Sequence, residues 1–408
     1  MSNPLSAGAV RTLAGLLADT APFWQPPCFH DDPPWVVARP ALAAALLAPD
    51  DDTLAMLEND PARLHGLLAA TVPELAALQQ TADACLHDAP LPVPPALPEV
   101  LGRDVPGRKW QQTLAFAAAA GAPQGAVVDW CCGKAHLGRL LARLHGVRVT
   151  GIERNAALCE SGRLLATRDR LDVTLLPADA LQIRAADAQL DARAHAVALH
   201  ACGDLHLALL RTAAGAQVAA LDVAPCCYHL TRDVRWQPLS AALRDSPLTA
   251  LAPARDDLRL AVQETVTASR RVIRQTRELA GWRLGFDRLQ RSVRGIDRAL
   301  PTPSRPARVL ADGFAAFCRD MAAHHGLQLP PDTDFPHWET LGHERLQRSR
   351  RLQLLRHAFR RPLEILLVAD RALWLGEQGY EVRLRTFCPR ALTPRNLLIQ
   401  ARRTVTAA

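Results

Sequence analysis

The segment Ala126–Leu141 constrains the fold more than any other part of the chain, because its pattern changes from strand to helix within a few residues. A short apolar run ends in Asp129, small residues follow, and an amphipathic helix begins at His136 and continues through Leu144. A strand, a turn of small residues and a helix form the first unit of nucleotide-binding α/β folds. Small side chains in the turn let the backbone approach a ligand held at the helix N-terminus.

Two acids at strand ends support this interpretation. Asp129 closes the first predicted strand, and we expect it to point into the crevice where such folds bind ligands. Glu153 closes the second predicted strand, Val147–Glu153, close to the ~20-residue spacing at which an acid reaches ribose hydroxyls. An ordinary βα turn with two exposed acids is the alternative.

The glycine pattern of dinucleotide-binding proteins is incomplete in this turn. Cys131 and Ala135 stand where glycines are expected, and only Gly133 remains. The broken pattern disfavours a dehydrogenase.

Strands and helices alternate through the next hundred residues, which predicts a parallel sheet with right-handed crossovers. After a helix at 107–120 and the first two strands, we expect helix 155–168, strand 172–176, strand 195–200, helix 205–214 and strand 218–223.

Three motifs at the predicted strand ends resemble the class I S-adenosylmethionine-dependent methyltransferases. They are DWCCGKAHLG at 129–138, ALHACGDLH at 198–206 and APCCYH at 224–229. More narrowly, they are similar to the branch that includes methyltransferase-like protein 25 and bacterial relatives. The resemblance covers about 105–230 and continues weakly to TPRN at 393–396; the family usually has glycine in place of Ala135. It implies a seven-stranded, Rossmann-like α/β fold and S-adenosylmethionine as cofactor.

The motifs supply the candidate site residues. By the resemblance, Asp179 would accept a hydrogen bond from the adenine amino group, and a helix N-cap is the alternative role. The predicted cofactor contacts are Asp129, Cys131, Gly133, Lys134, His136, Glu153, Asp179, Ala180 and His200. Predicted catalytic residues are Tyr228, His200 and Asp204, and predicted substrate contacts are Lys109, Cys226, Cys227, Tyr228, Arg395 and Asn396. The Tyr228 ring is expected to stack on a base, with its hydroxyl on the acceptor.

Several cysteines follow strands that we expect to be neighbours. Cys131, Cys132, Cys202, Cys226 and Cys227 would share one cleft with His136, His200 and His229. Three interpretations remain open: packing around the ligands, a Cys nucleophile after Pro225, and a metal site. We favour packing and predict no metal, since adjacent cysteines are poor partners on one tetrahedral ion.

The rest of the chain is mainly helical by its pattern. We predict an accessory domain at 1–104, the cofactor-binding core at 105–230, a helical insertion at 231–361, and a C-terminal helix with an antiparallel hairpin at 362–408. The insertion should contain helices near 238–244, 256–280, 282–292, 310–325 and 343–359. The hairpin strands, 380–387 and 397–402, should complete the sheet.

Composition and charge bear on partners and location. The chain has 408 residues, ten cysteines, 49% hydrophobic residues and a net charge of +7. With no signal peptide pattern and no membrane-spanning run, we expect reduced thiols and a cytoplasmic protein. Arginines cluster at 270–277 and 345–361, which suits phosphate backbones, although solvated helices are an equal alternative. The predicted function is methyl transfer, with RNA as first acceptor. A protein or small-molecule acceptor, or a catalytically silent binding or assembly factor, are the alternatives.

Overall fold

The computed structural model describes residues 5–264 and 269–404, except for the side chains of residues 99 and 100. Its contacts divide the chain into two compact units that interleave in sequence. The first unit, here called the sheet unit, comprises 1–20, 76–266 and 359–408; the second, the helical unit, comprises 21–75 and 267–358. Both units therefore draw on the predicted N-terminal segment 1–104 and on the predicted insertion 231–361.

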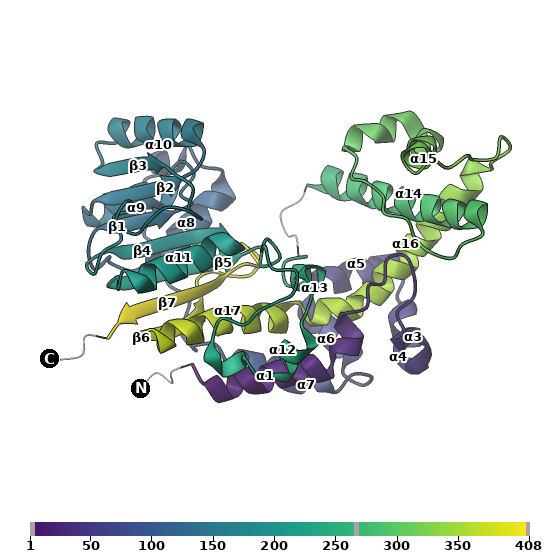
Figure 1. The fold of residues 1–408 in the computed structure, drawn as a ribbon, viewed down its shortest axis with the longest axis horizontal. Coiled ribbons are helices and arrows are strands. Elements are labelled where there is room, and N and C mark those ends of the chain that lie inside the picture. Colours follow the sequence, from purple (N-terminus) through teal and green to yellow (C-terminus); the bar gives the residue numbers. More distant parts are fainter. Residues whose placement is uncertain (1–4, 265–268, 405–408) are drawn as a thin grey trace. The chain divides into compact units, whose positions relative to one another are not determined.

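The sheet unit contains a seven-stranded sheet in the order β3-β2-β1-β4-β5-β7-β6. Its strands are β1 (Val127–Trp130), β2 (Val149–Glu153), β3 (Val173–Pro177), β4 (His195–Cys202), β5 (Ala220–Cys226), β6 (Tyr380–Thr386) and β7 (Leu397–Arg403). The first five strands pair in parallel, whereas β7 runs antiparallel to both β5 and β6. This confirms the predicted seven-stranded class I methyltransferase arrangement. Figure 1 shows the C-terminal hairpin, in yellow, beside the teal strand β5.

Helices cover the strands, and this explains the continuous apolar runs in the sequence. Every residue of β1 and β5 is buried, as expected for parallel strands packed on both faces. The helices of this unit are α1 (Ala7–Asp19), α7 (Glu74–Ala84), α8 (Gly107–Ala120), α9 (His136–His145), α10 (Ala156–Arg168), α11 (Asp204–Gly215), α12 (Pro247–Leu251), α13 (Arg255–Leu260) and α17 (Arg360–Glu377). Helices α9 and α10 pack on β1–β3, α11 on β4 and β5, and α17 on β6 and β7.

The proline-rich arm at 89–98 has no helix or strand, as its prolines predict. It and the residues before it run along β6, the edge strand. The His87 amide donates to the Leu384 carbonyl over 2.6 Å, and the Arg385 guanidinium donates to the Pro90 carbonyl over 2.7 Å. The arm thus covers part of an edge that would otherwise expose unpaired backbone groups.

The helical unit is built around two long helices that pack side by side (Figure 1). Its helices are α2 (Ala21–Trp24), α3 (Trp35–Ala38), α4 (Pro40–Leu47), α5 (Asp51–Asn59), α6 (Pro61–Leu68), α14 (Arg270–Arg294), α15 (Gly313–His324) and α16 (Phe335–Ala358). Aromatic residues such as Trp282, Phe286 and Phe317 form a core between α14 and α15. Short 3-10 helices lie at Glu99–Gly102, Ala241–Leu243 and Ala307–Asp312.

One predicted helix is wrong. The pattern at 256–280 predicts a single continuous helix, but α13 ends at Leu260 and α14 begins at Arg270. The Ser269 side chain caps α14 by accepting from the Val272 amide. The predicted helix 282–292 is the second half of α14, and residues 265–268 lie outside the described residues. In the part of the chain that the structure describes, none of the helices has the length and apolar character to cross a membrane.

Candidate active site

The carboxyl edge of the sheet carries strained backbone at three strand ends. Cys131, His200 and Cys227 have φ angles of 59°, 64° and 49°, in the left-handed region that non-glycine residues avoid. His200 lies at a register shift between β4 and β5. Such residues cost about 1–3 kcal/mol each and cluster at functional sites. The strain points to this edge of the sheet as the place where function resides.

An open cavity of about 560 Å³ lies at this edge, a volume that suits a nucleotide-sized ligand. It is lined by four of the predicted cofactor residues, Cys131, Glu153, Asp179 and Ala180, and by Cys202, Asp204 and His229. These residues follow five different strands, which is where open parallel sheets bind ligands.

Glu153 fastens the cavity wall to the sheet. One carboxylate oxygen accepts from the Gly133 amide over 3.1 Å, and the other accepts from the Asn155 amide over 2.8 Å. A carboxylate has lone pairs for further donors, so Glu153 can hold the loop and still receive ligand hydroxyls. The loop itself needs left-handed backbone at Gly133 and at Ala135, with φ of 59° and 52°. The second value explains why a glycine suits the position of Ala135.

The structure corrects the predicted orientation of Asp129. It is 2% exposed and does not line the cavity within the described residues. Its carboxylate accepts from the Gly138 amide over 3.0 Å, in the first turn of α9, and burial raises its pKa to about 7. A Cβ at Gly138 would lie 3.1 Å from the same carboxylate oxygen, so glycine permits this contact. Asp129 holds α9 against β1 and does not point into the crevice.

Asp179, predicted to contact the adenine, and Asp204, predicted to be catalytic, both lie in the cavity wall. The Asp179 carboxylate accepts from the Leu181 amide over 3.0 Å, which leaves a second oxygen for a ligand. Asp204 accepts from the Arg232 amide over 2.8 Å, and so ties α11 to the loop after β5. That loop is close: a Cβ at Gly203 would be 1.9 Å from the Leu230 carbonyl oxygen.

His200 and both lysines are absent from the described lining of the cavity. The His200 Nε2 atom is 2.8 Å from the Gln112 side-chain oxygen, and burial lowers the His200 pKa to about 4. Lys109 is exposed on α8, and its charge also disfavours protonation of His200 and His136. Lys134 is half-buried in the turn after β1.

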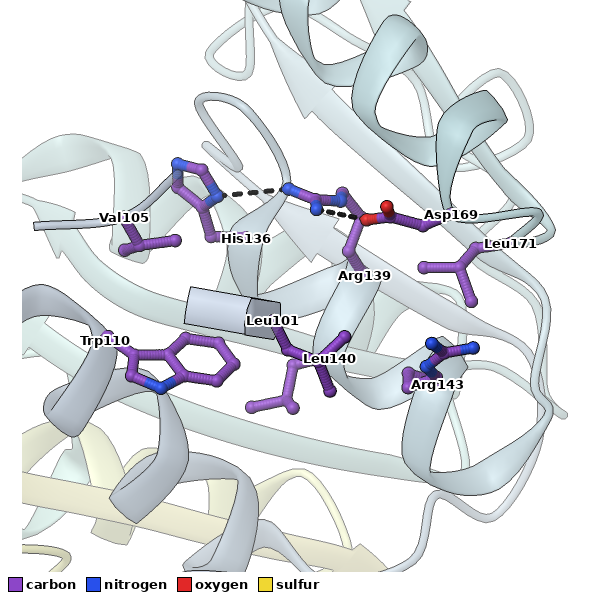
Figure 2. Close-up of a pocket in the computed structure, with 9 residues that line it drawn as sticks. All are labelled: Leu101, Val105, Trp110, His136, Arg139, Leu140, Arg143, Asp169 and Leu171. Carbon is purple, nitrogen blue, oxygen red and sulfur yellow. Dashed lines mark hydrogen bonds and ion pairs between the residues drawn. The ribbon is translucent and has the colours of Figure 1, made fainter. Parts of the chain in front are cut away.

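His136 belongs to a different and much smaller pocket, shown in Figure 2. The Arg139 guanidinium approaches the His136 Nδ1 atom at 3.4 Å and forms an ion pair with Asp169. Burial and neighbouring cations lower the pKa of His136 to about 4, so the ring is neutral at physiological pH. The prediction of His136 as a cofactor contact gains no support from this placement.

The predicted base-stacking role of Tyr228 is wrong. The side chain is 2% exposed, its hydroxyl donates to the Pro225 carbonyl over 3.2 Å, and its ring lies edge-on to His206. Arg371 lies over the ring at 5.6 Å. Tyr228 is therefore a core residue beneath the site.

The side chains of Arg395 and Asn396, predicted to contact the substrate, donate to backbone carbonyls of the protein itself. The Asn396 amide donates to the Cys388 carbonyl over 2.7 Å and is 4% exposed, so it does not face a substrate. The Arg395 guanidinium donates to the carbonyls of Val262 and Glu264.

The cysteines separate into two groups. Cys131 lines the cavity, and Cys132 lies against Gly151 on β2, where an added Cβ would be 2.7 Å from its sulfur. The sulfurs of Cys202, Cys226 and Cys227 lie within 4.8 Å of one another. Hydrogen bonds from Cys202 and Cys226 hold the pKa of Cys227 far below its usual value.

The loop that follows β5 also lines the cavity, which no motif in the sequence indicates. Thr231, Arg232 and the more distant Arg255 line the cavity, and Arg255 donates to the Arg232 carbonyl over 2.7 Å. Only the fold of this loop back over Gly203 brings these residues to the site. The motif APCCYH ends just before it.

One segment of the chain is similar to known methyltransferases. Residues 111–234 match the family model of a methyltransferase domain. No significant match is found among curated proteins. Similar solved structures include a Pyrococcus abyssi tRNA (uracil-54, C5)-methyltransferase with S-adenosyl-L-homocysteine, at 17% identity over 28% of this chain and 28% of that one, with a TM-score of 0.25.

Two further similar structures are methyltransferases with other substrates in their names. The magnesium protoporphyrin IX methyltransferase of Synechocystis has 15% identity over 32% of this chain and 61% of that one, with a TM-score of 0.24. The geranyl diphosphate C-methyltransferase of Streptomyces coelicolor has 18% identity over 34% and 58%, with a TM-score of 0.23. The chain thus spans 28% to 61% of the length of these three structures.

The matched segment contains all five parallel strands, and the C-terminal hairpin completes their sheet. Residues 111–234, less than half of the chain, are thus similar to a methyltransferase domain, and their strands take the order of a Rossmann-like sheet.

Proposed function

We propose that the protein is a methyltransferase that binds S-adenosylmethionine in the cavity at the ends of β1 to β5 and transfers its methyl group to RNA. The observation that carries the first part is the placement of two acids, Glu153 after β2 and Asp179 after β3, in the wall of one cavity of about 560 Å³. We also place the chain near the methyltransferase-like protein 25 branch, because the three motifs that resemble it follow β1, β4 and β5.

The residues present fit the cofactor by their chemistry. Carboxylate oxygens accept hydrogen bonds, so Glu153 can receive ribose hydroxyls and Asp179 an exocyclic amine. Ala180 is 6% exposed, and its small apolar side chain beside Asp179 leaves room for a flat ring. Bound S-adenosylmethionine supplies an electrophilic methyl group. The role of this chain is to hold the acceptor in line with that group and to exclude water.

The case for RNA rests on α14 more than on α16. The arginine-rich stretch 345–361 is largely used within the helical unit: Arg345 and Arg348 pair with Asp32, Arg350 with Glu58, and Arg351 with Asp51. By contrast, Arg270, Arg271 and Arg274 are exposed on α14 and form no ion pair within the described residues.

A groove of about 480 Å³ joins these arginines to α16. Arg270, Arg274, Arg277 and Arg350 line it, and Glu58 neutralises only the last two. Glu278 also lines the groove and lies 3.4 Å from His343, so Arg270 and Arg274 have no ion pair among the described residues. Two guanidinium groups without an ion pair beside an open groove favour a phosphate backbone as the partner.

A methyl-transfer assay with labelled S-adenosylmethionine tests the proposal. The full-length protein is offered total RNA, a protein extract and a small-molecule extract in parallel. We expect label in the RNA fraction, and its loss in an Asp179→Ala variant. Label only in the protein or small-molecule fraction would show that the acceptor is not RNA. No label in any fraction would favour the catalytically silent alternative.

A further inference from the structure

Three cysteine sulfurs converge at one point of the carboxyl edge. Cys202 ends β4, and Cys226 and Cys227 lie at the end of β5. The sulfurs of Cys202 and Cys226 are 3.3 Å apart, and all three sulfurs lie within 4.8 Å of one another. Two strands that are neighbours in the sheet thus bring three soft ligand atoms together.

The backbone explains how adjacent cysteines can face the same point. In a regular strand, Cys226 and Cys227 would point to opposite faces of the sheet. Cys227 has φ of 49°, which breaks this alternation and turns its sulfur toward Cys226 and Cys202. The expectation that adjacent cysteines are poor partners on one ion holds for extended backbone, which this strand end does not keep.

The cluster also opens toward the cavity. Cys202 lines the cavity together with His229, whereas Cys226 is 5% exposed. Nothing among the described residues forms a hydrogen bond with the buried Nδ1 atom of His229, two positions after Cys227. A polar atom that is buried and unpaired calls for a partner that the protein itself does not supply.

We propose that Cys202, Cys226 and Cys227 bind one Zn²⁺ ion as thiolates, with the fourth coordination position directed toward the cavity. Zinc accepts thiolate ligands in tetrahedral geometry, and three protein ligands with one open position are typical of sites that also meet a substrate. Binding releases the thiol protons to solvent, since only thiolates are ligands. The proposal concerns metal binding alone and stands whether or not RNA is the acceptor.

Metal analysis of the purified full-length protein tests the proposal. The protein is prepared under reducing conditions and equilibrated with Zn²⁺ in the presence of a weak competing chelator. We expect about one equivalent of zinc, with at least a tenfold loss of zinc affinity in Cys202→Ser, Cys226→Ser and Cys227→Ser. Cys131→Ser is the matched control, because Cys131 also follows a strand and lines the same cavity but lies outside the cluster. It should keep its zinc.

Cobalt spectroscopy of the unmodified chain makes the test independent of how the variants fold. Co²⁺ in the site should give the intense visible bands of four-coordinate cobalt and a near-ultraviolet charge-transfer band of three thiolates. The absence of both, with no zinc retained against the chelator, would overturn the proposal. So would an iron–sulfur group in place of zinc.

Discussion

Two regions of this chain, the core of the sheet unit and the first turns of α14 in the helical unit, keep charged groups in different environments. In the sheet unit, Asp129 and Glu364 are fully enclosed, and burial raises the pKa of each carboxyl group. In the helical unit, Arg270 and Arg274 stand exposed on α14, while Asp32 and Glu58 pair with arginines. In the first region, burial decides the protonation and geometry of the carboxyl groups. In the second, the guanidinium groups are solvated, so their electrostatic effect depends on salt.

A small added side chain should have a large effect at the close approach near β4, whereas the same change at an exposed helix position of the helical unit is tolerated. Gly203→Ala should destabilise the sheet unit by about 3–5 kcal/mol, because its Cβ would be 1.9 Å from the Leu230 carbonyl and its φ is 53°. Gly66→Ala in α6 meets no atom within 4 Å, and should stabilise by about 0.5–1 kcal/mol. Urea unfolding of both variants measures the difference. Equal changes in the free energy of unfolding of the two variants would contradict this contrast.

The buried carboxyl group of Asp129 should make stability depend on pH. Its folded pKa of about 7 exceeds the ordinary aspartate pKa of 3.8, so between these pH values the folded state holds a proton that the unfolded state has lost. Wild-type stability should therefore fall as pH rises from 4 to 7. Asp129→Asn cannot titrate, and its amide oxygen can still accept from Gly138.

We expect the Asp129→Asn variant to match the wild type near pH 4 and to exceed its stability by roughly 2–3 kcal/mol at pH 8, since each pKa unit is worth about 1.4 kcal/mol and entering water relieves part of the burial penalty. Unfolding curves of both proteins across this range provide the measurement. A stability difference that does not change with pH would mean that the Asp129 carboxyl group is ionised in the folded protein throughout.

Arginines on α14 should affect RNA affinity through charge alone. In filter binding at low salt, the double variant Arg270→Glu/Arg274→Glu should lose about 10- to 100-fold in affinity, with a shallower dependence on salt. Arg63→Glu is the control, since Arg63 is exposed in the same unit and lies outside the groove. Equal losses in both variants would show a nonspecific charge effect, and RNA binding that does not change with salt would refute the proposed surface.

The smallest effect concerns Tyr228. As a core residue, it should tolerate Tyr228→Phe with a loss of about 1 kcal/mol, the cost of the hydroxyl contact with the Pro225 carbonyl. Methyl transfer by the folded variant should remain near the wild-type rate. A large loss of turnover without a loss of stability would restore the catalytic role predicted from the sequence.

The sequence was sufficient to locate the five parallel strands, because each is a short apolar run closed by small or polar residues, and the resemblance implied their order. It also placed Glu153 and Asp179 at strand ends that meet at one cavity. It failed for Asp129 and Tyr228, which stand in equally suggestive motifs. Residue type and spacing do not reveal whether a side chain at a strand end turns outward, as Glu153 does, or inward, as Tyr228 does.

Contacts between segments that lie far apart in the sequence could not be predicted either. The convergence of Cys202 with Cys227 depends on a left-handed backbone angle, which no periodicity encodes. The interleaving of the two units follows from pairs such as Arg345 with Asp32, which lie far apart in sequence. In the stretch 345–361 the charges were visible in the sequence, but their partners were not.

Calorimetric titration of S-adenosylmethionine into the Glu153→Ala variant tests the central claim most directly. Glu153 lines the cavity and secures the Gly133 loop, so the variant should bind the cofactor at least ~10-fold more weakly than the wild type, about 1.4 kcal/mol. Leu164→Ala, an exposed change on α10, should leave affinity unchanged. Unchanged affinity in folded Glu153→Ala, or wild-type protein that binds NAD in preference to S-adenosylmethionine, would contradict the assignment of this cavity as the cofactor site.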